Sequence, residues 1–94
     1  MNNIRFIWDG SKASLNRRKH GISFEEAQTV FYDENAIEYF DPEHSEDEDR
    51  FIMLGFSFKL RMLVVCYCTR TENTIRIISA RKATRHEAEI YRKG

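Results

Sequence analysis

The sequence predicts a single α+β domain over residues 1–94, with a mainly antiparallel sheet and helices packed on one face. Five short segments alternate apolar and polar residues, as strands do, and three others carry helix start or stop signals. The last four strand segments follow one another through short links, which favours antiparallel pairing. The expected order is β-α-α-β-β-β-β-α. With 41% hydrophobic residues, the 94-residue chain can build one compact core.

The first half of the chain carries the clearest helix signals. A strand over residues 4–9 is followed by a basic helix over residues 12–20, which stops at Gly21 because glycine suits the C′ position. Ser23 and Glu26 fit a capping box, so Ser23 is the expected N-cap of a second helix. The predicted buried face of that helix comprises Phe24, Ala27, Val30 and Phe31.

The second half predicts four further strands, over residues 36–40, 51–57, 62–69 and 74–80. Strict alternation in the last strand would place Ile75, Ile77, Ser79 and Arg81 on one face and Arg76, Ile78, Ala80 and Lys82 on the other. Thr84 and Glu87 fit a second capping box, so the final helix should begin directly after this strand.

Positive charge gathers where the last strand ends. Arg76, Arg81, Lys82 and Arg85 lie within ten residues of one another, beside the start of the final helix, where the helix dipole is positive. Such a cluster predicts an anion site, and phosphate is its natural ligand. The alternative interpretation is that Arg81 and Lys82 are solvated charges paired with acidic residues.

The net charge is zero, but the charges are segregated along the chain. Residues 33–49 contain nine acidic residues and no lysine or arginine, whereas residues 50–94 contain ten basic and three acidic residues. A basic half of this kind attracts polyanions such as nucleic acid. Alternatively, the acidic stretch folds back on the basic half and neutralises part of it.

The polar loop over residues 41–50 combines three kinds of catalytic group. His44 can transfer protons near neutral pH, Glu48 can orient it, and Arg50 can bind an anion. The alternative is that this loop is an exposed acidic segment that serves solubility.

No spacing in the sequence predicts a metal or cofactor site. His86 lacks the second histidine of a zinc-protease helix, and Cys66 and Cys68 alternate along one strand, where we expect free buried thiols. The longest apolar run, residues 62–68, is too short to cross a bilayer, and the N-terminal residues lack an apolar signal region. We therefore expect a cytoplasmic protein with no cofactor and no membrane partner.

One set of motifs runs along nearly the whole chain. It comprises Phe6, Trp8, Asp9, Lys12, Asn16, residues 19–27, Val30, Phe31, Asp33, His44, Ser45, Glu48, Arg50, Gly55, residues 76–83, Glu87 and Tyr91. Taken together, these motifs resemble the BrnT family of toxins from bacterial type II toxin–antitoxin modules. The resemblance implies a RelE-like fold, RNA cleavage that inhibits translation, and neutralisation by BrnA, a ribbon-helix-helix antitoxin. The toxin would reach operator DNA only through that antitoxin.

Metal-free RNA cleavage needs a base near the ribose 2′-hydroxyl, positive charge at the scissile phosphate and an acid for the leaving oxygen. Physical reasoning assigns Arg81, with Arg50 and Lys82, to the phosphate. His44 is the expected base or acid, and Glu48 either orients it or replaces it as base. The remaining expected contacts are Tyr91, as a stacking group or proton donor, and Arg76, Arg85, Arg70 and Lys19, as RNA-binding residues. The alternative is a non-catalytic module that binds RNA or protein through the same basic surface.

Overall fold

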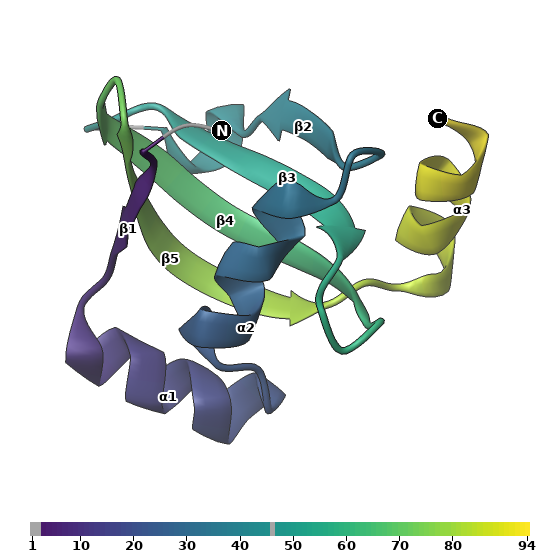
Figure 1. Ribbon diagram of the computed structural model, residues 1–94, viewed down its shortest axis with the longest axis horizontal. Coiled ribbons are helices and arrows are strands. Elements are labelled where there is room, and N and C mark those ends of the chain that lie inside the picture. The colour runs from purple at the N-terminus through teal and green to yellow at the C-terminus, as the bar shows by residue number, and fades with distance from the viewer. Residues whose placement is uncertain (1–2, 46) are drawn as a thin grey trace.

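The computed structural model describes residues 3–45 and 47–94. Its strands form one sheet in the order β1-β5-β4-β3-β2 (Figure 1). β1 runs parallel to β5, and every other neighbouring pair is antiparallel, which confirms the mainly antiparallel α+β prediction. The strands are β1 (Arg5–Ile7), β2 (Ile37–Phe40), β3 (Arg50–Phe56), β4 (Met62–Thr71) and β5 (Thr74–Lys82).

Two helices cover one face of the sheet. They are α1 (Gly10–His20) and α2 (Phe24–Gln28), and α2 continues into the 3₁₀ helix η1 (Thr29–Tyr32). The α1 helix begins two residues earlier than predicted because the Asp9 carboxylate accepts a hydrogen bond from the Ser11 backbone N–H, 3.1 Å away, and so acts as the N-cap. It ends, as predicted, at Gly21, whose φ of 72° lies in the left-handed region that glycine adopts most easily.

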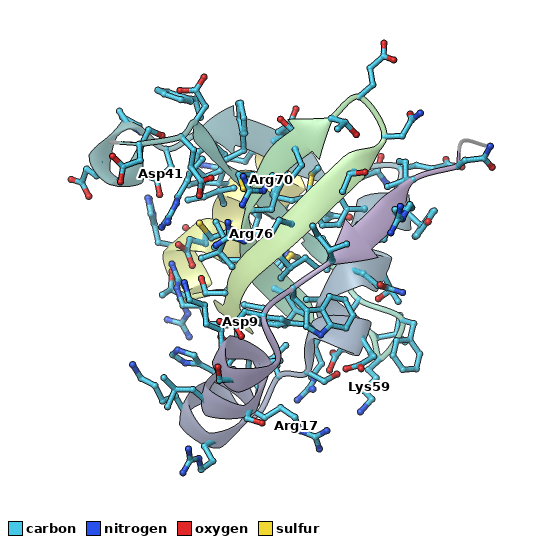
Figure 2. The ribbon with its side chains drawn as sticks, turned by 90° about the vertical axis from the view of Figure 1, so that its left-hand side faces the viewer. Asp9, Arg17, Asp41, Lys59, Arg70 and Arg76 are labelled. Atoms are coloured by element: carbon cyan, nitrogen blue, oxygen red, sulfur yellow. The ribbon has the colours of Figure 1, made fainter. Side chains whose placement is uncertain are left out.

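The C-terminal helix, α3 (Arg85–Lys93), begins at a complete capping box. The Thr84 side chain accepts from the Glu87 N–H, and the Glu87 side chain accepts from the Thr84 N–H. Unlike α1 and α2, this helix approaches the other side of the sheet, where the Tyr91 and Phe56 ring centroids are 5.4 Å apart (Figures 1 and 2). The sequence predicted that the helices pack on one face, and this is wrong for α3, which occupies one end of the other face.

The hydrophobic core lies between the sheet and the first two helices. Its buried members are Ile22, Phe24, Ala27, Val30, Leu63, Val65, Ile77 and Ala80.

One close approach beside the core requires glycine, because a Cβ on Gly55 would lie 3.0 Å from both the Ala36 Cβ and the Asp33 Oδ2.

Within the described chain, no helix is long and apolar enough to cross a membrane.

A β-bulge divides β5 into two halves. Cys66 of β4 pairs with Ser79, but the next residue, Tyr67, pairs with Ile77, so Ile78 is an extra residue in β5. An extra residue shifts the alternation of side chains by one position. Ile77 and Ala80 are therefore both buried in the same core, although they are three residues apart.

The bulge also corrects one prediction from the sequence. Strict alternation put Arg76 and Arg81 on opposite faces, and this is wrong. Arg76 pairs with Cys68 and Arg81 with Val64, and these two β4 residues are four apart and share one face. Both arginines therefore lie on the face away from α1 and α2.

The side chain of Asn16, which is buried on α1, fixes the second half of β5. Its Nδ2 donates to the Ala80 carbonyl at 2.8 Å and to the Ile22 carbonyl at 2.9 Å, and its Oδ1 accepts from the Ala80 N–H at 3.1 Å. β1 pairs only with residues 74–76, so beyond them this amide takes the place of a neighbouring strand. It satisfies backbone groups that would otherwise be buried without partners.

Glu26 differs from its predicted role. Ser23 does cap α2 by accepting from the Glu26 N–H, but the Glu26 carboxylate does not complete the capping box. It is buried, accepts from the Ser57 hydroxyl at 2.6 Å, and forms a bidentate pair with Arg61. The Arg61 hydrogen bonds hold the pKa of Glu26 below its usual value despite burial. The turn between β3 and β4 is thereby joined to α2.

Replacing Arg61 with methionine should destabilise the fold at neutral pH, because it leaves the buried Glu26 carboxylate without its cation. Since the pair lowers the folded-state pKa, its stabilisation is present above pH 4.5 and is lost as the pH falls. The difference from wild type should therefore shrink in acid. Urea unfolding measures it, with Lys59→Met on the same turn as the control. Equal losses for the two variants would contradict the role of the pair.

Candidate nucleic-acid interface

Three arginines converge on one carboxylate on the sheet face away from α1 and α2. Glu48 lies 3.6 Å from Arg50, 3.8 Å from Arg76 and 3.9 Å from Arg70. Figure 2 shows Arg70 and Arg76 on the same side of the sheet, with Asp41 further out on that side. The acidic stretch therefore does fold back on the basic half at Glu48, as the alternative interpretation of the charge pattern expected.

A pocket of about 220 Å³ adjoins this cluster. Arg50 and Arg81 both line it, from β3 and from the end of β5, and Ser79 and Asp41 contribute polar groups. Its apolar lining includes Cys66 and Ile78. Two of the three residues assigned to the phosphate from sequence are thus brought to one pocket.

Arg81 is already paired. Its Nη1 and Nη2 donate to the two carboxylate oxygens of Glu87, each at 2.9 Å, and its Nη1 also donates to the Lys82 carbonyl. The Arg81 hydrogen bonds are the main reason that the pKa of Glu87 falls to about 2. The alternative interpretation of Arg81 as a strand-end cation paired with an acid therefore describes part of its role. A guanidinium has five N–H donors, so this pair does not exhaust its capacity to bind an anion.

The loop before β3 is tied at its two ends. The Asp41 N–H donates to the Arg50 carbonyl at 2.9 Å, and the Ser45 hydroxyl accepts from the Arg50 N–H and donates to the Asp41 carbonyl. Between them lies the short 3₁₀ helix η2 (Pro42–His44), so the backbone of His44 is close in sequence to both anchors. The side chain of His44 lies outside the described part of the structure, and its catalytic role stays a prediction.

The other predicted site residues are spread over the surface. Lys82 pairs with Leu63, whose side chain is in the core, so it lies on the opposite face from Arg81. The Tyr91 hydroxyl donates to the Asp33 carboxylate at 2.7 Å, away from the Arg50 pocket. Arg85 is exposed at the start of α3, and Lys19 is exposed near the end of α1.

Three features of the site were not found from sequence. Asp41 and Ser79 line the pocket, and the Nε of Arg50 is buried without a hydrogen-bond partner among the described residues. The only signal for Asp41 was its place in the acidic loop. Cys66 and Cys68 are free thiols, and burial raises the pKa of each, so they are not poised as nucleophiles.

The described residues contain no group of three or more histidine, cysteine, aspartate or glutamate side chains placed to hold a metal ion. The charged groups that line the pocket are instead two guanidinium groups and the Asp41 carboxylate. Such a surface is of the kind that binds phosphate groups.

Comparison with known proteins identifies the family. The model of the ribonuclease toxin BrnT of type II toxin–antitoxin systems matches residues 8–87, so the chain belongs to the BrnT family. The crystal structure of the Brucella abortus ribonuclease toxin BrnT has the same fold, with a TM-score of 0.67 and 23% identity over 87% of this chain and 99% of that one. A search of curated proteins found no match.

The pairing of Glu87 with Arg81 predicts a specific acid response. Because the folded-state pKa is about 2 and the ordinary value is 4.5, this pair stabilises the fold above pH 4.5 and its contribution is lost as the pH falls towards 2. Glu87→Gln lacks this titration, so its unfolding free energy should fall less steeply over that range. Urea unfolding as a function of pH measures it, and Glu89→Gln on the same helix is the control. A slope unchanged in Glu87→Gln would show that the pair contributes nothing.

Proposed function

We propose that this protein is a metal-independent endoribonuclease that cleaves RNA in the cytoplasm and thereby inhibits translation. A BrnA-like ribbon-helix-helix antitoxin neutralises it and supplies its only contact with operator DNA. Membership of the BrnT family supports this function. The observation that carries it is the convergence of Arg50, Arg70 and Arg76 on Glu48, beside a pocket that Arg50 shares with Arg81.

The arginines supply the charge that the reaction needs. Attack of the ribose 2′-oxygen on phosphorus builds negative charge on the non-bridging oxygens, and fixed cations stabilise that charge. Arg50 is well placed for this task because its guanidinium borders the pocket and its buried Nε lacks a partner among the described residues. Arg81 adds a second guanidinium from the other side of the pocket.

Proton transfer is assigned to the acidic loop. A base removes the proton of the 2′-hydroxyl as the new P–O bond forms, and an acid protonates the 5′-oxygen as the old P–O bond breaks. Glu48 is the candidate base. It is a carboxylate on the sheet face away from α1 and α2, called the open face below, and its neighbours are the phosphate-binding arginines. His44, close to Arg50 in sequence, is the candidate acid.

The outer residues would hold the rest of the RNA strand. Arg70, Arg76, Arg85 and Lys19 are cations that can neutralise phosphates on either side of the cleaved bond. Lys82 and Tyr91 lie away from the pocket, so their proposed contribution is limited to outer contacts.

A non-catalytic binding module is the second candidate. The observation that favours it is that Arg81 and the three arginines around Glu48 are already paired with carboxylates, so the surface could bind RNA or protein without reacting. Only a cleavage assay separates the two candidates.

The purified protein should cleave single-stranded RNA in the presence of excess EDTA, because arginines supply the charge stabilisation. Adding purified antitoxin should stop the reaction. Gel electrophoresis of a labelled RNA measures both effects. Activity that disappears in EDTA and returns with a divalent metal would refute metal independence, and RNA that is bound but never cut would favour the binding module.

Arg81→Ala should lower the cleavage rate by about 10²–10³-fold, the usual effect of removing one preorganised charge stabiliser. Arg81→Lys should recover only part of the rate, since an ammonium keeps the charge but loses the two-pronged geometry. Single-turnover kinetics measures the rate, and circular dichroism checks that the variants fold.

The matched control is Arg92→Ala, which removes an exposed cation from the last turn of α3 and should leave the rate nearly unchanged. If Arg81→Ala cleaves as fast as wild type, or fails to fold, Arg81 is not the charge stabiliser. The loop that carries His44 and Glu48 would then be the place to search.

A further inference from the structure

A second basic cleft lies between α1 and the bulge of β5. Its volume is about 240 Å³, and it is lined on one side by α1 and on the other by Ile78 and Ser79. Three of its seven lining residues are basic and none is acidic. The basic ones are Lys12, Lys19 and His20.

The sequence of α1 builds one wall of this cleft. Lys12, Leu15, Asn16, Lys19 and His20 are spaced by three or four residues, so they share one face of the helix. That face turns toward β5, where a surface helix ordinarily presents apolar side chains. Here only Asn16 is buried, and Leu15 is 48% exposed. The face is therefore built to meet a charged ligand with one apolar contact.

The cleft has a fixed shape because Asn16 joins its two walls. The Asn16 side chain makes two hydrogen bonds to Ala80, which holds α1 against β5 directly after the bulge. The bulge residue Ile78 and its neighbour Ser79 form the opposite wall. Both walls are thus set before any ligand binds.

This cleft adjoins the pocket of Arg50 and Arg81. Ile78 and Ser79 line both, so the bulge forms a shared boundary between them. Figure 2 shows α1 at the lower end of the sheet. A single strand that occupies one pocket can therefore pass over the bulge into the other.

We propose that the cleft between α1 and the β5 bulge is a second RNA-binding subsite, which holds the backbone of nucleotides that flank the cleaved bond. Lys12 and Lys19 bind phosphates, and Leu15 contacts a ribose or base. This inference rests on the proposed ribonuclease function. RNA is favoured over an acidic protein segment because the cleft borders the phosphate pocket at Ile78 and Ser79, and a charged groove that follows the backbone is how single strands are bound.

The test compares two double variants with the same change of charge. Lys12→Gln/Lys19→Gln removes two cations from the cleft, and Arg17→Gln/Arg18→Gln removes two exposed cations of the same helix that do not line it. Figure 2 shows Arg17 extending from α1 away from Arg76. Glutamine is a good helix former, so both variants should fold, which circular dichroism checks.

Binding is measured by fluorescence anisotropy with a labelled 2′-O-methyl RNA of about ten nucleotides, long enough to cover both pockets. This RNA cannot be cleaved, so the result does not depend on catalysis. The lysine variant should raise the Kd about tenfold at physiological salt. It should also make the slope of log K against log salt less steep by about 1.4, the value for two lost phosphate contacts on a single strand. The arginine variant should change both much less.

The outcomes separate this subsite from the proposed function. If wild-type protein cleaves no RNA but the lysine variant still weakens binding as stated, the subsite stands and the ribonuclease proposal fails. If the lysine variant binds like wild type, or the arginine variant weakens binding equally, there is no subsite. A poly-glutamate peptide is the competing probe: if the lysine pair controls its affinity and not that of RNA, the cleft binds acidic protein instead.

Discussion

The bulge at Ile78 is the constraint on which the site depends. It lets β5 place Ile77 and Ala80 in the same core while Arg76 and Arg81 project from the other face. A regular strand would have put either an arginine into the core or an apolar residue onto the open face. One extra residue in β5 therefore allows the apolar side chains to pack in the core and the arginines to lie on the opposite face. The amide of Asn16 bonds both backbone groups of Ala80, two residues beyond the bulge.

The positive charge of the open face is held in place without being cancelled. Glu48 contacts three arginines at 3.6–3.9 Å, and Glu87 binds Arg81 through both oxygens. The contacts of Glu48, at 3.6–3.9 Å between partly exposed groups, are weak, typically about 0–1 kcal/mol, so a phosphate can displace them at little cost. The carboxylates thus limit the conformations of the long side chains before any ligand binds. This is preorganisation, which reduces the entropy lost when the ligand binds.

Helix ends were predictable from local signals in the sequence. Gly21, Ser23 and the pair of Thr84 and Glu87 specified helix ends, because each acts on backbone groups within a few residues of itself. Contacts between distant segments were not predictable. The partner of Glu26 lies 35 residues away in a turn, so its carboxylate was assigned to the nearest N–H instead.

The same limit applied to the site. The cationic residues were recognised by their type and crowding, and Arg50 and Arg81 do share a pocket. The sheet face on which each arginine of β5 lies could not be derived from the sequence, because a bulge is defined only by the register of the neighbouring strand. The fit of the acidic stretch on the basic half was left open for a similar reason. Sequence shows that opposite charges exist, but only the fold shows that Glu48 is one of the acidic residues that meet the arginines.

Glu87 serves two structures at once. One of its oxygens accepts both from the Thr84 N–H that starts α3 and from Arg81, while the other accepts from Arg81 alone. Any substitution at this position alters the first turn of a helix together with the charge that reaches the pocket. The two properties therefore cannot be adjusted separately at residue 87, and a variant selected for a different substrate would have to compensate elsewhere in α3. A single carboxylate therefore couples the start of the C-terminal helix to the charge beside the pocket.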